Sequence, residues 1–247
     1  GAVMGSAESD ECQIDALAQA WAVLSGVAPA DRAAQALDAM EARLVDEDAG
    51  ILRLLAPALD VTPNDPGYIK GYVPGVRENG GQYTHAALWA VRALAEAGRC
   101  ERAAPLLGML SPVRHGDSPE AVAVYKTEPY VIAADVYGVA PHVGRGGWTW
   151  YTGSAGWMLR VAVESVLGFG LDRGEAITLA PCIPADWPGF AIRYRLPDGS
   201  GTVYTITVQR GETPGLTLDG ATLPVPHAGW RVPLVRDGAV HEVQLTI

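Results

Sequence analysis

Long apolar stretches are missing from this 247-residue chain. No run reaches the roughly 18 to 20 apolar residues that a membrane-spanning helix needs. The first residues also lack the basic and apolar blocks of a signal peptide. Three widely separated cysteines are too few for a disulfide framework or a zinc site. We therefore expect a soluble, cytoplasmic protein.

Several common catalytic signatures are absent as well. The chain contains no phosphate-binding Walker loop, no dinucleotide fingerprint after a strand and no Gly-x-Ser-x-Gly elbow. His115 and His142 have no clustered partners at metal-ligand spacing. We therefore expect neither a metal nor an organic cofactor.

Positive charge is scarce and unevenly distributed. The 18 basic and 28 acidic residues give a net charge of −10, which argues against nucleic acid as a partner. Residues 1–65 carry −9 and residues 161–247 carry −3, whereas residues 66–160 carry +2. A small anion would bind most readily in this positive middle third, although chance fluctuation explains the imbalance equally well.

Hydrophobic periodicity predicts helices in the first two thirds of the chain. The predicted ranges are 11–25, 30–45, 82–97, 100–110, 118–125, 128–137 and 153–167. Ile14, Leu17 and Trp21 share one face of the first helix, and Trp89 and Trp157 are assigned to the core. One face of the second helix carries Leu37, Met40 and Leu44. Residues 46–81 are a long connection rich in proline and glycine, and connections of that length are often functional.

After Gly170 the pattern changes to short runs rich in β-branched residues, separated by turn signals such as Pro197-Asp198-Gly199. Strands are predicted at 176–179, 190–196, 202–209, 216–218, 230–235 and 240–247. The sequence thus predicts an α+β protein with helices in residues 1–170 and an antiparallel β domain in residues 171–247.

Three loops carry residues that a scaffold does not require: 71–85, 125–130 and 141–154. In the third loop Thr152 stands where a helix N-cap is expected, and His85 lies in the first turn of its own helix. Free N–H groups at a helix start attract anions. The alternative is that Thr152 only caps its helix and that His85 is an ordinary hydrogen-bonded side chain.

The aromatic residues favour a sugar ligand. Seven Trp and nine Tyr against two Phe give rings that combine an apolar face with a polar edge. Sugar rings offer the same combination, so Trp148, Trp150 and Tyr151 in the third loop are candidate sugar contacts.

Four segments carry a family resemblance: GYIKGYVPGVRENGGQYTHAALW (67–89), EPYVIAADVY (128–137), PHVGRGGWTWYTGSAGWMLR (141–160) and PCIPADWPGF (181–190). Over residues 5–200 the chain resembles the carboxyl-terminal part of glycoside hydrolase family 94. That family includes cellobiose and chitobiose phosphorylases, 1,2-β-oligoglucan phosphorylases and a region of cyclic β-1,2-glucan synthases. The resemblance implies a partial (α/α)6 barrel of about six helices followed by a β-sandwich-like domain.

The resemblance also implies a chemistry. Family members are inverting enzymes in which inorganic phosphate, a co-substrate, attacks the anomeric carbon of a β-linked glucan. His85, Thr152 and Gly153 match phosphate-binding positions, Glu78 beside Arg77 matches an acceptor-sugar contact, and Glu128 lies near the substrate. Gln82 is assigned to the substrate side with them.

One departure from the family pattern concerns the general acid. The family's acid lies in an Asp-Trp-Asn-Asp segment, whereas the only Asp-Trp here is Asp186-Trp187, in a different motif. We therefore expect a fragment, inactive alone, which buries its exposed helix flanks against the amino-terminal part of the polypeptide or in a homodimer. It would belong to a cytoplasmic enzyme or to the cytoplasmic region of an inner-membrane synthase. The alternative is a non-catalytic carbohydrate-binding or assembly module.

Overall fold

The fold combines a helical unit with a β unit, which confirms the predicted α+β class. A computed structural model describes residues 4–63, 65–150, 152–224 and 229–247. Tyr151, a predicted sugar contact, lies outside the described residues. The chain divides into two compact units, Gly1–Ala162 and Val163–Ile247, which are described separately below. Among the described residues, no helix is long and apolar enough to cross a bilayer.

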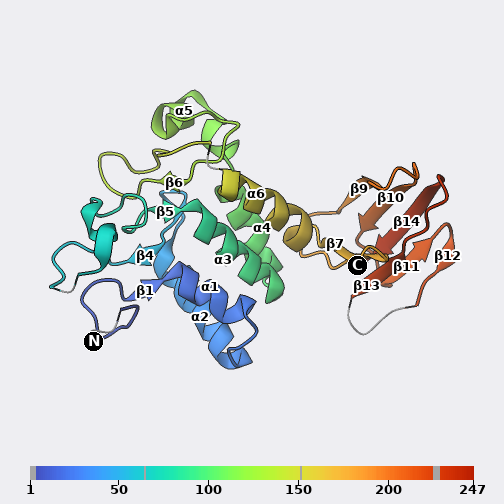
Figure 1. The fold of residues 1–247 in the computed structure, drawn as a ribbon, viewed down its shortest axis with the longest axis horizontal. Coiled ribbons are helices and arrows are strands. Elements are labelled where there is room, and N and C mark those ends of the chain that lie inside the picture. The colour runs from blue at the N-terminus through green and yellow to red at the C-terminus, as the bar shows by residue number, and fades with distance from the viewer. Residues whose placement is uncertain (1–3, 64, 151, 225–228) are drawn as a thin grey trace. The chain divides into compact units, whose positions relative to one another are not determined.

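The first unit is built around helices that share one apolar core (Figure 1). The helices that contribute to this core are α1 (Ala16–Leu24), α2 (Ala30–Leu44), α3 (Thr84–Glu96), α4 (Cys100–Met109) and α6 (Thr152–Arg160). A further helix, α5 (Pro119–Tyr125), contributes its Tyr125 to a separate, smaller buried cluster. After α6 the chain continues as a π-helix, η3 (Val161–Val166). The apolar face predicted for α2 is confirmed, because Leu37, Met40 and Leu44 are fully buried.

The first predicted helix begins later than its periodicity suggests. Ile14 and Asp15 form strand β1 (Ile14–Asp15), which pairs with β4 (Leu55–Ala56). The Asp15 carboxylate then accepts the N–H groups of Leu17 (2.7 Å) and Ala18 (3.2 Å) as an N-cap, and this starts α1 at Ala16. Ile14 is therefore buried in a strand, whereas Leu17 and Trp21 are each 42% exposed.

The helix predicted at 128–137 is wrong. Asp135 and Val136 form strand β6 (Asp135–Val136), which pairs with β5 (Gln82–Tyr83). Pro129 disfavours helical backbone at the residue before it. The Ala134 N–H donates across the loop to the carbonyl of Trp148 (2.6 Å) rather than along a helix. Hydrogen bonds to segments distant in sequence therefore set the backbone of residues 134–136, and the helical spacing of the apolar residues does not.

The connection between α2 and α3 also contains local structure that the sequence did not reveal. It holds the short hairpin of β2 (Val45–Asp46) and β3 (Ile51–Leu52), and the 3-10 turn η1 (Gly67–Gly71). These elements fix the conformation of a connection that composition alone presents as a loop. Outside this connection, a second 3-10 turn, η2 (Arg114–Gly116), precedes α5.

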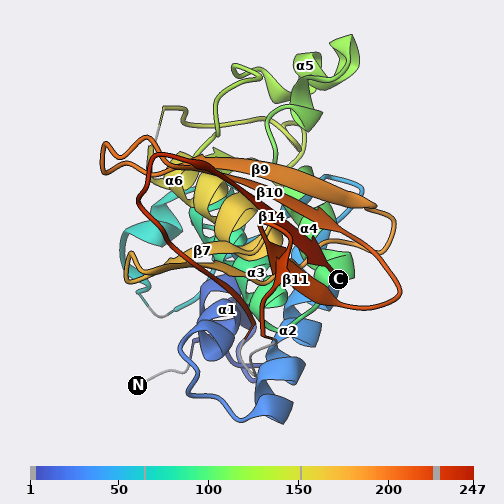
Figure 2. The ribbon, with the colours of Figure 1, turned by 90° about the vertical axis from the view of Figure 1, so that its right-hand side faces the viewer.

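The second unit consists of two sheets, and the six predicted strands are confirmed. A five-stranded sheet has the order β12 (Ala221–Thr222), β11 (Gly215–Leu218), β14 (Val240–Thr246), β10 (Val203–Gln209), β9 (Gly189–Arg195) (Figure 2). A three-stranded sheet has the order β13 (Trp230–Pro233), β8 (Ala176–Leu179), β7 (Phe169–Asp172). The prediction missed β7 because Phe-Gly-Leu-Asp contains no β-branched residue.

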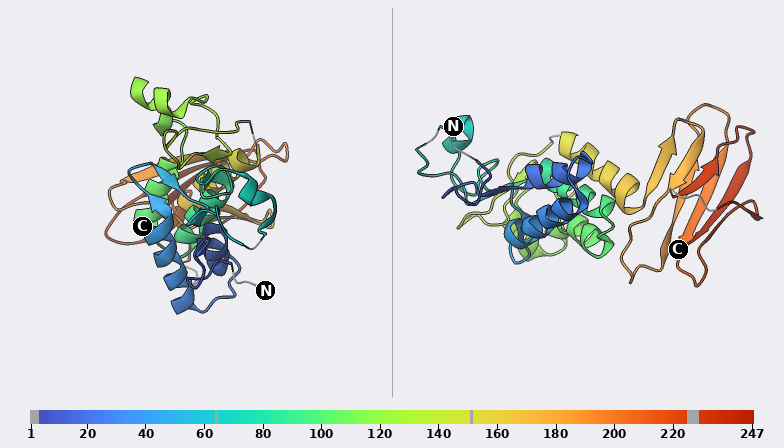
Figure 3. Two further views of the ribbon diagram at one scale, coloured as in Figure 1. Left: turned by 90° about the vertical axis from the view of Figure 1, so that its left-hand side faces the viewer. Right: turned by 90° about the horizontal axis from the view of Figure 1, so that it is seen from below.

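The second unit departs from the prediction in one pairing. Among the described strands, β10 and β14 pair in parallel, whereas the others pair antiparallel. Side chains from both sheets, including Ile177, Val232, Tyr204 and Val243, meet in one buried cluster. Figure 3 shows these strands in orange and red. The predicted β domain therefore has a core shared by two sheets, and the larger sheet is mixed rather than wholly antiparallel.

Candidate functional site

Pairing of β5 with β6 brings the first unusual loop, residues 71–85, next to the chain segment that joins the other two. Gln82 lies opposite Val136 and Tyr83 opposite Asp135. Next to this pairing, the Gly138 N–H donates to the carbonyl of Gly75 (2.8 Å). Segments 71–85 and 134–148 are thus neighbours in space although some 60 residues separate them in sequence (Figure 1).

Two buried amides hold the first loop in place. The Asn79 side chain accepts the Leu59 N–H (2.7 Å) and donates to the carbonyls of Leu59 (2.7 Å) and Tyr72 (2.8 Å). Gln82, predicted to bind substrate, is only 1% exposed. Its amide accepts the Leu52 N–H (3.1 Å) and donates to Thr84 (3.3 Å). Gln82 therefore supports the loop from inside rather than facing a ligand.

Arg77 and Trp148 form the centre of the loop surface. The Arg77 guanidinium lies 5.2 Å from the Trp148 ring centre and 5.3 Å from that of Tyr72. It also donates to the Glu78 carboxylate (3.3 Å), and both charged side chains are largely buried. Trp148 remains 55% exposed. We call this group of residues 72, 77, 78 and 148 the Arg77–Trp148 stack.

Asp135 lies buried next to the stack and was not among the predicted site residues. Its Oδ1 accepts the Trp148 N–H (3.1 Å) and its carbonyl accepts the Gly147 N–H (2.8 Å), while Oδ2 has no hydrogen-bond partner. Burial raises the pKa of Asp135, and the positive charge of Arg77 opposes that rise. A lone carboxylate inside the apolar run of residues 131–136 is the sequence signal that would have indicated it.

Glu128 and Trp150 are brought together at the rim of the same loops. The Trp150 indole N–H donates to Glu128 Oε1 (3.1 Å), and Trp150 is 66% exposed. A hydrogen bond from its own backbone N–H, assisted by Trp150, lowers the pKa of Glu128. Glu128 is thus a stable anion and not a protonated acid at neutral pH.

His85 and the start of α6 lie against each other, as the anion-site hypothesis requires. A methyl group added to Gly153 would come within 3.7 Å of His85 Nδ1. The helix begins at Thr152 itself, so Thr152 and Gly153 lie in its first turn and Thr152 is not the residue before it. We call His85, Thr152 and Gly153 the anion corner.

The surroundings of His85 are aromatic. Its ring packs edge-on against Trp89, with ring centres 4.6 Å apart, and lies 5.9 Å from Trp157. Both tryptophans are partly buried and pack on the helical core. His85 Nε2 and Trp89 Nε1 are buried without a hydrogen-bond partner. Burial lowers the pKa of His85, so its imidazole is neutral at pH 7.

The anion corner and the Arg77–Trp148 stack are close along the chain. Trp148 precedes Thr152 by four residues, which span at most about 14 Å when extended. Glu78 likewise precedes His85 by seven residues through the fixed β5 strand.

Among the described residues, no three His, Cys, Asp or Glu side chains gather as metal ligands would.

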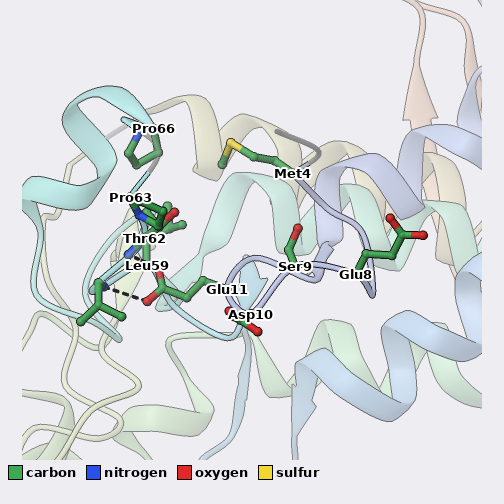
Figure 4. A pocket seen from close by; sticks show the side chains of 10 residues that line it. Met4, Glu8, Ser9, Asp10, Glu11, Leu59, Thr62, Pro63 and Pro66 are labelled. Carbon is green, nitrogen blue, oxygen red and sulfur yellow. Dashed lines mark hydrogen bonds between the residues drawn. The ribbon is translucent and has the colours of Figure 1, made fainter. Parts of the chain in front are cut away.

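A well-formed pocket of about 490 Å³ lies elsewhere in the first unit (Figure 4). Its lining includes the acidic residues Glu8, Asp10 and Glu11, and none of the lining residues that the structure describes is basic. The Glu11 carboxylate already accepts the N–H groups of Asp60, Val61 and Thr62 at 2.8–3.1 Å. An anion would be repelled here, so this pocket is not a phosphate site.

Comparison with known proteins places these loops in a family. The sequence profile described as the Glycosyl hydrolase 94 superfamily, catalytic domain, matches residues 1–168. The chain is 50% identical over 212 residues to cyclic beta-(1,2)-glucan synthase NdvB of Rhizobium meliloti, which covers 86% of this chain and 7% of that protein.

Two further relatives are phosphorylases. Solabiose phosphorylase of Paenibacillus borealis is 33% identical over 249 residues, covering 99% of this chain and 31% of the relative. N,N'-diacetylchitobiose phosphorylase of Vibrio proteolyticus is 30% identical over 255 residues, covering 100% and 30% respectively. The chain therefore spans less than a third of the length of these relatives. On its residues 1–168, the chain belongs to the glycosyl hydrolase 94 superfamily.

Proposed function

We propose that this chain supplies the phosphate and acceptor-sugar half of an inverting phosphorylase or glycosyltransferase acting on β-linked glucans. The substrate would be a β-1,2-glucan or a cellobiose-like sugar. The observation that carries the proposal is His85: its Nδ1 faces Gly153 in the first turn of α6, and its Nε2 is buried without a hydrogen-bond partner. The family's synthases and phosphorylases support the reaction class.

In the proposed reaction, phosphate is the nucleophile. The His85 imidazole and the N–H groups of Thr152 and Gly153 would hold it at the start of α6. Inverting hydrolases need a second carboxylate to activate water. Phosphate is already an anion, so hydrogen-bond donors replace that base and no cofactor is needed. Arg77 and Glu78 would bind acceptor hydroxyls while Trp148 and Trp150 cover a sugar face.

The remaining groups would come from outside these 247 residues. We propose that an aspartic acid in the amino-terminal part of the enzyme protonates the leaving oxygen. The helices of the first unit would form part of an (α/α)6 barrel and the second unit a β-sandwich-like domain, in a cytoplasmic enzyme or cytoplasmic region. Proton donation contributes about 10²–10⁴-fold, so the chain alone should not release sugar phosphate from a glucan.

Calorimetry with phosphate and with short β-1,2-glucans tests the proposal. We expect weak phosphate binding that His85→Ala removes. Adding the amino-terminal segment should restore phosphate-dependent sugar-phosphate release in the wild type but not in His85→Ala. Robust turnover by the purified chain alone would contradict the assignment of the acid to another segment.

The second candidate is a carbohydrate-binding or assembly module without catalysis. The exposure of Trp148 and Trp150 favours it, because exposed indoles bind sugars without further chemistry. Sugar binding that is indifferent to His85→Ala, without phosphate binding, would support this alternative over the first.

A further inference from the structure

Two carboxylates compete for the guanidinium of Arg77. It donates to Glu78 (3.3 Å), its neighbour in sequence, and its positive charge also acts on Asp135. All three side chains lie away from solvent. Those of Arg77 and Glu78 are 16% and 14% exposed, and Asp135 is 1% exposed. One base therefore serves two acids in surroundings where an unpaired charge is costly.

Asp135 is the carboxylate that this arrangement leaves incomplete. Among the described residues, its Oδ2 is buried without a hydrogen-bond partner. Burial raises the pKa of Asp135 most strongly, the Trp148 N–H and the charge of Arg77 oppose that rise, and the charge of Glu78 adds to it. Because Glu78 engages Arg77, Asp135 keeps its proton up to a higher pH.

Trp148 is the shared neighbour of the base and the second acid. Its ring centre lies 5.2 Å from the Arg77 guanidinium, and its backbone N–H donates to Asp135 Oδ1 (3.1 Å). Tyr83 stands opposite Asp135 in the pairing of β5 with β6. Beside Asp135, the titratable residues of the first loop and of β5 are thus Arg77, Glu78 and Tyr83.

We propose that Asp135 is a second partner of Arg77 and receives its guanidinium when an acceptor sugar engages Glu78. Sugar hydroxyls would donate to Glu78 in place of the guanidinium, which turns over the Trp148 ring to Asp135. Asp135 gives its proton to the solvent in this exchange. It is a positioning residue, because it draws Arg77 away from Glu78 and does not touch the sugar. The inference rests on the proposed function, which assigns Glu78 to the acceptor.

Glu78→Gln tests the exchange without any sugar, because it removes the competing carboxylate. The carboxyl carbon of Asp135 is titrated by NMR in the 247-residue chain. We expect its acid dissociation constant to rise about tenfold, since an adjacent arginine favours an ionised carboxyl group. Glu96→Gln is the matched control, because it releases Arg92 from its own glutamate (2.7 Å) and should leave Asp135 unchanged. No change in Glu78→Gln would overturn the proposal.

Loss of the Glu78 charge also favours ionisation of Asp135 without any movement of Arg77. The same substitution is therefore repeated in an Arg77→Gln background, where its effect should shrink by about threefold or more. Arg77→Lys serves as a second background, because lysine keeps the charge but lacks the guanidinium fork. Equal effects of Glu78→Gln in all backgrounds would mean simple repulsion between the two acids and would refute the exchange.

Calorimetry with a β-1,2-linked glucose disaccharide tests the role of the sugar. Binding is measured near the pKa of Asp135 in phosphate-free buffers that differ in ionisation enthalpy. Binding should release protons from the wild type but not from Asp135→Asn, whose amide oxygen can still accept the Trp148 N–H. Sugar binding without proton release would overturn the exchange. If no sugar binds, the proposed function fails, and the Glu78→Gln titration decides whether Asp135 is the second partner of Arg77.

Discussion

The two units differ in how they satisfy buried polar side chains. In the second unit, both ring nitrogens of His241 are bonded, to Asp219 (2.7 Å) and Asp237 (3.2 Å), and the Tyr204 hydroxyl accepts the Val235 N–H (2.7 Å). In the first unit, polar atoms remain buried without a partner. Among the described residues, these atoms belong to His85, Trp89, His115, Thr127 and Asp135.

This difference indicates where ligands act. A buried polar group without a partner costs about 1–3 kcal/mol, so it is kept where a ligand or a further segment completes the bond. His85 and Asp135 flank the loops that carry the family motifs. Among the described residues of the second unit, no buried side-chain nitrogen or oxygen lacks a hydrogen-bond partner. Four predictions test this contrast, in order of decreasing effect.

Gly147→Ala should destabilise the first unit by about 1–3 kcal/mol, the cost of overpacking a filled site. A Cβ there would lie 2.5 Å from both carboxylate oxygens of Asp135. Urea unfolding measures the change. Gly156→Ala in α6 is the control, since nothing lies within 4 Å of its Cβ, and it should not destabilise the chain. Equal stability of the two variants would mean that Asp135 does not fix this loop.

Gly153→Ala should weaken phosphate binding about tenfold while leaving the fold intact. The added methyl makes ordinary contact with His85 but occupies space that the anion needs. Tenfold corresponds to about 1.4 kcal/mol, the value of one hydrogen bond. Calorimetry compares it with Gly156→Ala on the same helix. Equal phosphate affinity in both variants would mean that the anion does not bind at the first turn of α6.

Sulfate binding should strengthen several-fold as the pH falls below 6. Burial lowers the pKa of free His85, and a bound anion favours its protonated form. Sulfate keeps its charge over this range, so the change reports the imidazole. His85→Asn should bind sulfate weakly and without this pH dependence. A pH response that survives the substitution would assign the titration to another group.

His241 should make the second unit more stable at pH 6 than at pH 8.5. Hydrogen bonds that the His241 ring donates to the carboxylates of Asp219 and then Asp237 raise the pKa of His241, and the ring stacks on Tyr204. Because the folded pKa lies above the unfolded value, the stabilisation is complete below about pH 6.5 and is lost as the pH rises through the folded pKa. We expect a melting-temperature difference on the order of a few degrees. His241→Gln should remove it.

The sequence predicted elements where local rules decide the structure. The period of α2 and the β-branched strands of the second unit are examples, since each buries the face that its pattern marks. The prediction from sequence failed at residues 128–137. There, Asp135 and Val136 pair with Gln82–Tyr83 as a strand, although the apolar spacing indicates a helix. It also missed the parallel pairing of β10 with β14, because strand direction depends on contacts distant in sequence.

The candidate site was predictable to a similar degree. The motif loops identified His85, Gly153, Arg77 and Trp148, which the structure brings together in two pairs, His85 with Gly153 and Arg77 with Trp148. Residues that support the loops from the protein interior were either assigned to ligand binding or not identified. Gln82 stands in a motif yet is buried, and Asp135 is a buried carboxylate whose partners come from a loop 12 residues later.

The central claim is that the first unit holds phosphate between His85 and the first turn of α6. The most direct measurement is an NMR titration of the 247-residue chain with phosphate, which follows the signals of the His85 imidazole and the Gly153 amide. The account predicts that both signals move together with one dissociation constant and that His241 does not respond. Phosphate-induced shifts elsewhere, with His85 and Gly153 unchanged at saturation, would contradict it.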